Sequence, residues 1–79
     1  MITAYVLLNT DSVDPTQVAQ EIMYLEEVDN VHQTTGDYAL IVRINAPDMI
    51  RLREEVVTKM EKIKGVTKTT TLIVEDQSL

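Results

Sequence analysis

The chain has 79 residues, 44% of them hydrophobic and 25% charged, which suits one small domain and excludes a multidomain enzyme. It contains no cysteine, so disulfides and cysteine-based metal sites are excluded. The formal net charge is -6, and all seven basic residues lie from Arg43 onward; because this balance repels phosphate backbones, we expect no direct nucleic-acid partner.

The apolar runs are short, and their length bears on whether the chain associates with a membrane. The longest are 5–8 and 38–42, far below the roughly 20 residues of a membrane helix. We therefore expect no membrane partner and a cytoplasmic location. A domain this small buries little core, and without disulfides or metal the common remedy is self-association. A homo-oligomer is the working hypothesis.

The first half of the chain predicts a strand, a helix and a second strand. Ile2–Asn9 is an apolar run typical of a strand. Asp14-Pro15 places a capping carboxylate before a proline at the first helical position, so a helix begins there. We expect it to end near Glu27. Residues 31–35 then predict a more polar strand, and Gly36 supplies the glycine that a tight reversal needs.

The second half repeats this order. Residues 38–44 form the most apolar strand, and 45–48 open a second helix that Gly65 ends as a left-handed cap. Residues 67–75 are rich in β-branched side chains and predict the last strand, followed by a short tail over 76–79. The expected inward helix stripe consists of Met49, Leu52, Val56, Met60 and Ile63.

The two halves resemble one another, because residues 28–35 align with 63–70 at a constant offset in the same helix-to-strand context. The order β-α-β-β-α-β predicts an α+β, ferredoxin-like plait, in which one four-stranded antiparallel sheet carries both helices on one face. The other face is then bare.

Strand alternation assigns side chains to the two faces of this sheet. The apolar face expected beneath the helices consists of Ala4, Val6, Leu8, Leu40, Val42, Ile44, Leu72 and Val74. The opposite face would carry Tyr5, Leu7, His32, Thr34, Ala39, Ile41, Thr69, Thr71 and Ile73. This second set is too apolar to be fully exposed, so we expect two copies to pack face to face through it. The predicted dimer interface is Tyr5, Leu7, His32, Ala39, Ile41 and Ile73.

The sequence assigns no catalytic residue, metal site or cofactor. His32 is the only histidine and has no cysteine beside it to share a metal, so it is read as structural. Asp37 is favoured as a turn residue that binds its own backbone, although it is also a possible general acid or base. The hydroxyls of 69–71 suit a strand, and they are also able to line a polar ligand site.

Several of these segments together resemble a known family. They are Thr35-Gly36-Asp37-Tyr38 running into Leu40-Ile41-Val42, then Gly65-Val66, and a Thr-rich last strand that ends in Leu72-Ile73-Val74. The pattern is similar, from Tyr5 to Val74, to the effector-binding domain of the Lrp/AsnC transcriptional regulators, also called the RAM domain. In that family a DNA-binding helix-turn-helix normally precedes this module, so residues 1–79 are expected to be a stand-alone RAM domain.

The resemblance implies a homodimer through the sheets, higher rings of dimers, and a small effector, often an amino acid, bound between dimers near Gly36. The candidate effector-binding residues are Thr35, Gly36, Asp37, Thr69 and Thr71. The family commonly has an acidic residue where this chain has Ala39, and Asp37 is the candidate to replace it. The implied function is a non-enzymatic module that senses a metabolite and acts with DNA-binding Lrp/AsnC-type paralogues.

Two alternatives remain open at the level of sequence. Dimeric α+β barrel enzymes, such as small monooxygenases and isomerases, use the same plait, but they need a polar cavity between helices and sheet. A purely oligomeric scaffold without ligand is the third possibility.

Overall fold

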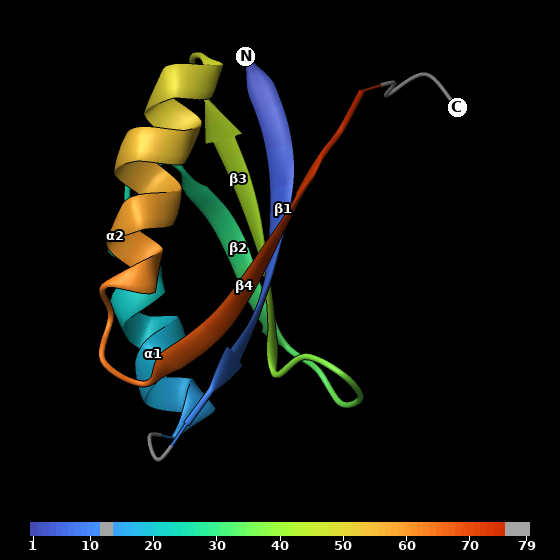
Figure 1. Ribbon diagram of the computed structural model, residues 1–79, viewed down its shortest axis with the longest axis vertical. Helices are drawn as coiled ribbons and strands as arrows, with labels where there is room; N and C mark the ends of the chain where they lie inside the picture. Colours follow the sequence, from blue (N-terminus) through green and yellow to red (C-terminus); the bar gives the residue numbers. More distant parts are fainter. Residues whose placement is uncertain (12–13, 76–79) are drawn as a thin grey trace.

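The computed structural model describes residues 1–11 and 14–75, so the predicted tail over 76–79 lies outside the described residues. The elements in chain order are β1 (Ile2–Thr10), α1 (Pro15–Ile22), β2 (Val28–Gln33), β3 (Leu40–Ala46), η1 (Arg51–Val57), α2 (Thr58–Glu61) and β4 (Val66–Ile73). The strands form one antiparallel sheet in the order β2-β3-β1-β4. Both helical segments cover the same face of this sheet (Figure 1). The predicted α+β plait is confirmed.

The first helix begins where the sequence predicts but ends earlier. Asp14 caps it by accepting a hydrogen bond from the N–H of Thr16 at 2.9 Å. The helix stops at Ile22, so the predicted end near Glu27 is wrong. Residues 23–27 form tight turns instead, as in the hydrogen bond from the N–H of Leu25 to the carbonyl of Ile22 at 3.0 Å. These turns free Val28 to start β2 opposite Ile44.

The second helix combines a π-helical stretch, η1, with the α-helical turn α2. Asp48 caps its start by accepting a hydrogen bond from the N–H of Arg51 at 2.8 Å. The wider turn brings the hydroxyl of Thr58 to the carbonyl of Arg53, five residues earlier, at 2.9 Å. The expected inward stripe is nevertheless kept, since Leu52, Val56 and Met60 are buried and Met49 and Ile63 pack against the core.

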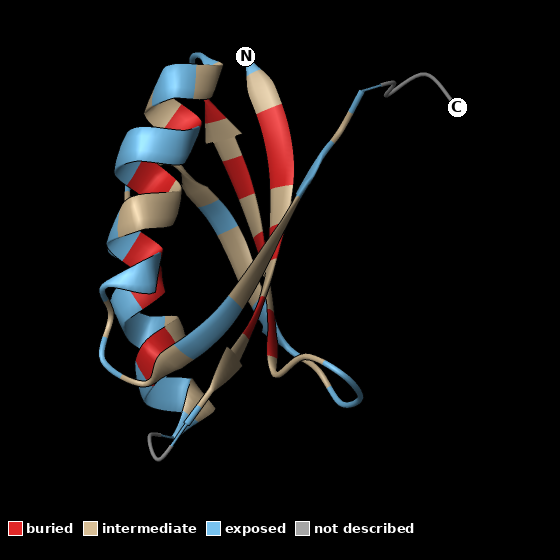
Figure 2. Cartoon of the chain, in the orientation of Figure 1, coloured by how far each residue is buried: buried red, intermediate tan, exposed pale blue. Residues whose placement is uncertain are grey.

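The core lies between the helices and the two central strands, where buried positions alternate along β1 and β3 (Figure 2). Directly opposed residues of an antiparallel pair share a face, and Val6 opposite Val42 and Leu8 opposite Leu40 both point to the helices. The fully buried core consists of Ala4, Val6, Leu8, Val18, Ile22, Leu40, Val42, Ile44, Ala46, Leu52, Val56 and Met60.

The edge strand β4 has the opposite phase to the one predicted. Thr71 lies opposite Val6 and Ile73 opposite Ala4, so both lie on the helix side. Leu72 lies opposite Tyr5, on the side away from the helices. The assignment of Leu72 and Val74 to the helix side, and of Thr69, Thr71 and Ile73 to the bare side, is therefore wrong.

A β-bulge causes this reversal. Asn9 pairs with Lys68 whereas the next residue, Thr10, pairs with Val66, which leaves Thr67 as an extra residue in β4. Val66 packs against the core, and a strict two-residue count from it would carry Lys68 and Leu72 inward as well. The extra residue cancels that count.

We call the sheet surface away from the helices the open face. Its residues, read from the strand pairing, are Asn30 and His32 on β2, Ile41, Arg43 and Asn45 on β3, Thr3, Tyr5, Leu7 and Asn9 on β1, and Lys68, Thr70 and Leu72 on β4.

Candidate functional site

The loop between β2 and β3, residues 34–39, projects on the side away from the helices (Figure 1). It closes through the N–H of Thr34, which donates to the carbonyl of Ala39 at 2.9 Å. The hydroxyl of Thr34 also donates to the carbonyl of Tyr38 at 2.7 Å. Gly36 has φ +115°, and a Cβ built there would meet no atom within 4 Å. The glycine is thus required by backbone conformation, and the space beside it is open.

Asn9 fixes this loop from the neighbouring strand. Its Nδ2 donates to the carbonyl of Asp37 at 2.8 Å, and its Oδ1 accepts from the N–H of Ala39 at 3.0 Å. That N–H also donates to the carbonyl of Leu8 at 3.0 Å. The sequence reasoning missed this role, although a polar asparagine after the apolar run of β1 is the feature that points to it. The two hydrogen bonds of Asn9 tie the loop to β1.

The tip of the loop offers donors. Within the described residues, no backbone N–H from Thr35 to Tyr38 donates a hydrogen bond to another part of the chain. Thr35, Gly36 and Asp37 are all exposed. Successive backbone N–H groups around a glycine with positive φ are typical of sites that receive an anion.

The structure brings Thr35, Gly36 and Asp37 together but separates them from the other two candidates. Thr69 lies opposite Leu8 on the helix side, and its hydroxyl donates to Glu61 Oε2 at 3.2 Å. Thr71 lies on the same side. These two threonines therefore lie on the opposite side of the sheet from the open face.

The threonine that meets the loop is Thr70. Its Oγ1 lies 3.0 Å from the phenol oxygen of Tyr38 in a hydrogen bond that either hydroxyl is able to donate. Lys68, two residues earlier on the same face, has its Nζ 5.8 Å from the centre of the Tyr38 ring. We call Tyr38, Lys68 and Thr70 the rim cluster, because β4 is an edge strand.

The predicted interface residues mostly share one face. The residues on the open face are Tyr5, Leu7, His32 and Ile41. All of them except His32 are half-buried. Ala39 is half-buried and packs against the core at the base of the loop. Ile73 does not belong with them, because it lies on the helix side. Its place is taken by Leu72, which is 51% exposed.

A polar group closes the end of the open face away from the loop. Asp29 is the extra residue of a bulge in β2, and it accepts a hydrogen bond from Nδ2 of Asn45. The hydroxyl of Thr3 donates to Oδ1 of the same Asn45 at 2.6 Å. Arg43 Nε lies 3.7 Å from Asp29 Oδ2, an ion pair that is too long for a hydrogen bond. This face is thus apolar in the middle and polar at both ends.

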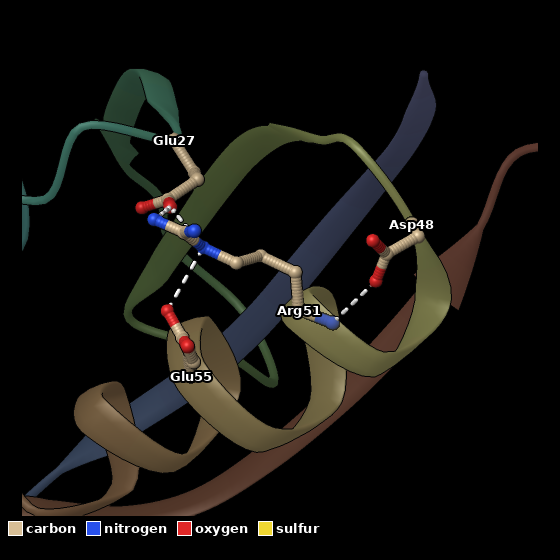
Figure 3. Close-up of polar contacts among 4 residues, drawn as sticks. All are labelled: Glu27, Asp48, Arg51 and Glu55. Atoms are coloured by element: carbon tan, nitrogen blue, oxygen red, sulfur yellow. Dashed lines mark hydrogen bonds and ion pairs between the residues drawn. The ribbon is translucent and has the colours of Figure 1, made fainter.

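Arg51 links two segments on the other side of the molecule (Figure 3). Its Nη2 lies 2.8 Å from Glu27 Oε2, and its Nε lies 2.9 Å from Glu55 Oε2. The hydrogen bond to Glu27 is the main reason that the pKa of Arg51 is raised above its usual value, and the charge of Glu55 adds to it. This cluster joins the turn before β2 to the start of η1, and it is read as structural.

Three further observations bound the chemistry. A hollow on the outer side of α1 is lined mainly by Gln17, Gln20, Glu21, Tyr24 and Lys64, none of which the sequence singled out. Among the described residues, no group of three histidine or acidic side chains is placed to hold a metal ion. In the same residues no helix is long and apolar enough to cross a membrane.

Comparison with known proteins gives consistent results. Residues 3–78 match the family model described as the Lrp/AsnC ligand binding domain. An uncharacterised HTH-type transcriptional regulator of Pyrococcus abyssi is 29% identical over 72 residues, which are 91% of this chain and 46% of that protein. The chain thus spans about half the length of the curated relatives it matches.

Solved structures agree with this match. The structure of TTHA0845 from Thermus thermophilus superposes with a TM-score of 0.91 at 28% identity, covering 100% of this chain and 99% of that one. A Neisseria meningitidis transcriptional regulator, solved as an L-Met complex, has the same fold at 15% identity and a TM-score of 0.87, covering 99% of this chain and 52% of that one. The chain belongs to the Lrp/AsnC ligand-binding domain family.

Proposed function

We propose that this chain is a non-enzymatic regulatory module that binds a small effector at the β2–β3 loop and assembles through its open face. The observation that carries the proposal is the loop itself. Gly36 gives the loop its positive-φ turn, and Asn9 fixes the shape of the loop by hydrogen bonds. The exposed N–H groups of the loop lack partners within the described residues. A loop that is already ordered spends little conformational entropy on binding.

The proposed effector carries a carboxylate, as amino acids do. Carboxylate oxygens accept hydrogen bonds from backbone N–H groups, so they suit the donors at residues 35–37. Asp37 is exposed and is the acidic side chain nearest in sequence to these donors, which makes it the candidate partner for an ammonium group. The L-Met complex of the Neisseria meningitidis regulator supports an amino acid as the first ligand to test.

Assembly is proposed through the open face. Tyr5, Leu7 and Ile41 form an apolar centre there, and Leu72 extends it at the edge. A second copy packed face to face would remove this surface from water, and each copy would bring the same residues. Higher assemblies would then place the loops of neighbouring dimers around the effector.

The regulatory output is proposed to run through mixed assemblies. The curated relatives are HTH-type regulators about twice as long as this chain, and the net charge of -6 opposes direct contact of this part with DNA. Paralogues that carry a DNA-binding half are therefore the proposed partners, and a regulator of this type would work in the cytoplasm. Co-purification of such a paralogue with the tagged chain would support this, and recovery of the chain alone would count against it.

The barrel-enzyme alternative fits less well. It requires a polar cavity between the helices and the sheet, and in this chain that space is filled by apolar side chains. Val6, Leu40, Leu52 and Met60 are all 0% exposed there. No observation favours it over a binding module.

A thermal-shift screen across the twenty amino acids tests effector binding. A ligand that binds only the folded state adds about 2.7 kcal/mol of stability at 100 times its Kd. For a ligand that is found, Asp37→Ala is expected to weaken binding about tenfold, because one charge-assisted hydrogen bond is lost. Glu54→Ala, an exposed carboxylate on η1, is the matched control.

Gly36→Ala provides a second arm of this test. Because the added Cβ meets nothing, any loss of binding reports the altered backbone and not a clash. A screen without a single stabilising ligand, or an effector that ignores both Gly36→Ala and Asp37→Ala, would overturn the proposed site.

A further inference from the structure

The rim cluster on the open face supplies a second set of donors beside the loop. Tyr38 is the second-last residue of the loop, while Lys68 and Thr70 come from β4. The strand pairing places the two β4 residues opposite Asn9 and Leu7, on the face to which the loop projects. The three side chains thus meet from two segments that are distant in sequence.

Hydrogen-bond donors in this cluster remain available to a ligand, and none of its three side chains is a charged acceptor. In the Tyr38–Thr70 pair only one hydroxyl hydrogen lies between the two oxygens. Whichever residue donates it, the other hydroxyl keeps its own hydrogen for a ligand. Lys68 adds three N–H donors, and within the described residues it forms no ion pair.

The neighbouring polar groups are already occupied. Both polar atoms of the Asn9 amide bind the loop backbone, and the Thr34 hydroxyl binds the carbonyl of Tyr38. They therefore do not compete for a ligand at the rim. An unpaired ammonium in a chain of net charge -6 favours a ligand with a single negative charge, because a dianion would meet stronger repulsion from the rest of the protein.

We propose that Lys68 and the Tyr38–Thr70 hydroxyl pair act together with the N–H groups of residues 35–37 as the anchoring site for the carboxylate of the effector. The inference rests on the proposed effector function and names its chemical class. The effector is a small monocarboxylic acid, and an amino group is not required for it to bind.

The experiment is an NMR titration of the ¹⁵N-labelled chain with small probes that carry different charged groups. Pyruvate carries the carboxylate alone, L-alanine carries carboxylate and ammonium, and ethylamine carries the ammonium alone. The amides of Tyr38, Lys68 and Thr70 are expected to shift with pyruvate and L-alanine but not with ethylamine. Sulfate tests the dianion, and it is expected to cause no saturating shift at these amides.

Variants then separate the anchor from general surface charge. Lys68→Gln is expected to raise the Kd of pyruvate about tenfold or more, since a charged donor is lost. Lys64→Gln removes the same charge from an exposed position outside the cluster, and it is expected to leave the Kd unchanged. Tyr38→Phe keeps one free hydroxyl hydrogen, on Thr70, so its effect is expected to be under threefold.

The outcomes distinguish this inference from the proposed function. Equal shifts with ethylamine, a saturating shift with sulfate, no shift with either acid, or a pyruvate Kd that is unchanged by Lys68→Gln would each overturn the anchor. The anchor would also fail if the amino-acid screen found an effector that Lys68→Gln binds as tightly as the wild type, and in that case the effector function would stand.

Discussion

The two faces of the sheet are built from adjacent residues of the same strands, yet they differ in how far their side chains are buried. Leu8 points to the helices and is 0% exposed, whereas Leu7 points to the open face and is half-buried. The helix side is closed by side chains of this chain alone. The open face has an apolar centre with polar groups at both ends, and this difference is the basis for proposing that the first face stabilises the fold while the second is completed by binding.

The largest expected difference between the faces comes from Leu8→Ala and Leu7→Ala. Leu8→Ala should lower the free energy of unfolding by about 2–5 kcal/mol, because it leaves a cavity in a packed core. Leu7→Ala should cost about 1 kcal/mol in dilute protein, since its side chain is already partly in water. Urea unfolding measures both. Equal losses at low concentration would mean that the two faces do not differ in this way.

The second test places a charge at the centre of the open face. Ile41→Lys should dissociate the dimer, because assembly would desolvate an unpaired ammonium in each copy. Light scattering at micromolar concentration measures the mass, and Gln20→Lys on the exposed side of α1 is the matched control. A wild-type chain that is already monomeric there, or an Ile41→Lys variant of unchanged mass, would contradict assembly through this face.

The third test uses the phase of β4. Leu72→Lys should weaken the dimer by roughly 10–100-fold, since a largely exposed leucine that a partner covers contributes about 1.5–3 kcal/mol. Ile73→Lys, one residue further and on the helix side, should change the dimer constant by less than threefold. The reverse ranking would restore the face assignment expected from the sequence.

The smallest expected effect lies on the helix side, at Arg51. Arg51→Met should lower the urea midpoint slightly while leaving the assembled mass unchanged, because the variant loses its bonds to Glu27 and Glu55 but keeps most of its apolar stem. The difference from the wild type should shrink toward 1 M salt, where charges are screened within about 3 Å. A difference that persists in salt would show that packing, and not charge, carries the effect.

The central part of the fold was predictable because hydrophobic alternation decides it. Val6, Leu8, Leu40 and Val42 lie where the two-residue period puts them, and the positive φ of Gly36 follows from its place in a tight reversal. The edge strand was not predictable in this way. A bulge is decided by how β4 pairs with β1, and no local pattern around Thr67 reveals it.

The candidate site was predictable only along the chain. Thr35, Gly36 and Asp37 are consecutive, so the resemblance to the family was enough to select them. Asn9 and Thr70 reach the loop from other strands, and their contacts depend on register. Three threonines in a row look alike in sequence, and only the pairing with β1 shows which of them meets Tyr38.

The bulge at Thr67 decides on which face of the sheet the later side chains of β4 lie. Deleting Thr67 would remove the bulge and keep the pairs, because Thr10 would still lie opposite Val66 and Asn9 opposite Lys68. Lys68, Thr70 and Leu72 would then stay on the open face, and Thr69, Thr71 and Ile73 would stay on the helix side. A single-residue gap at Thr67 in an alignment of relatives is therefore compatible with the same contacts on β4. A single-residue gap within 68–72, where the pairing is regular, would instead shift the alternation and predict a homologue whose contacts on this strand have exchanged faces.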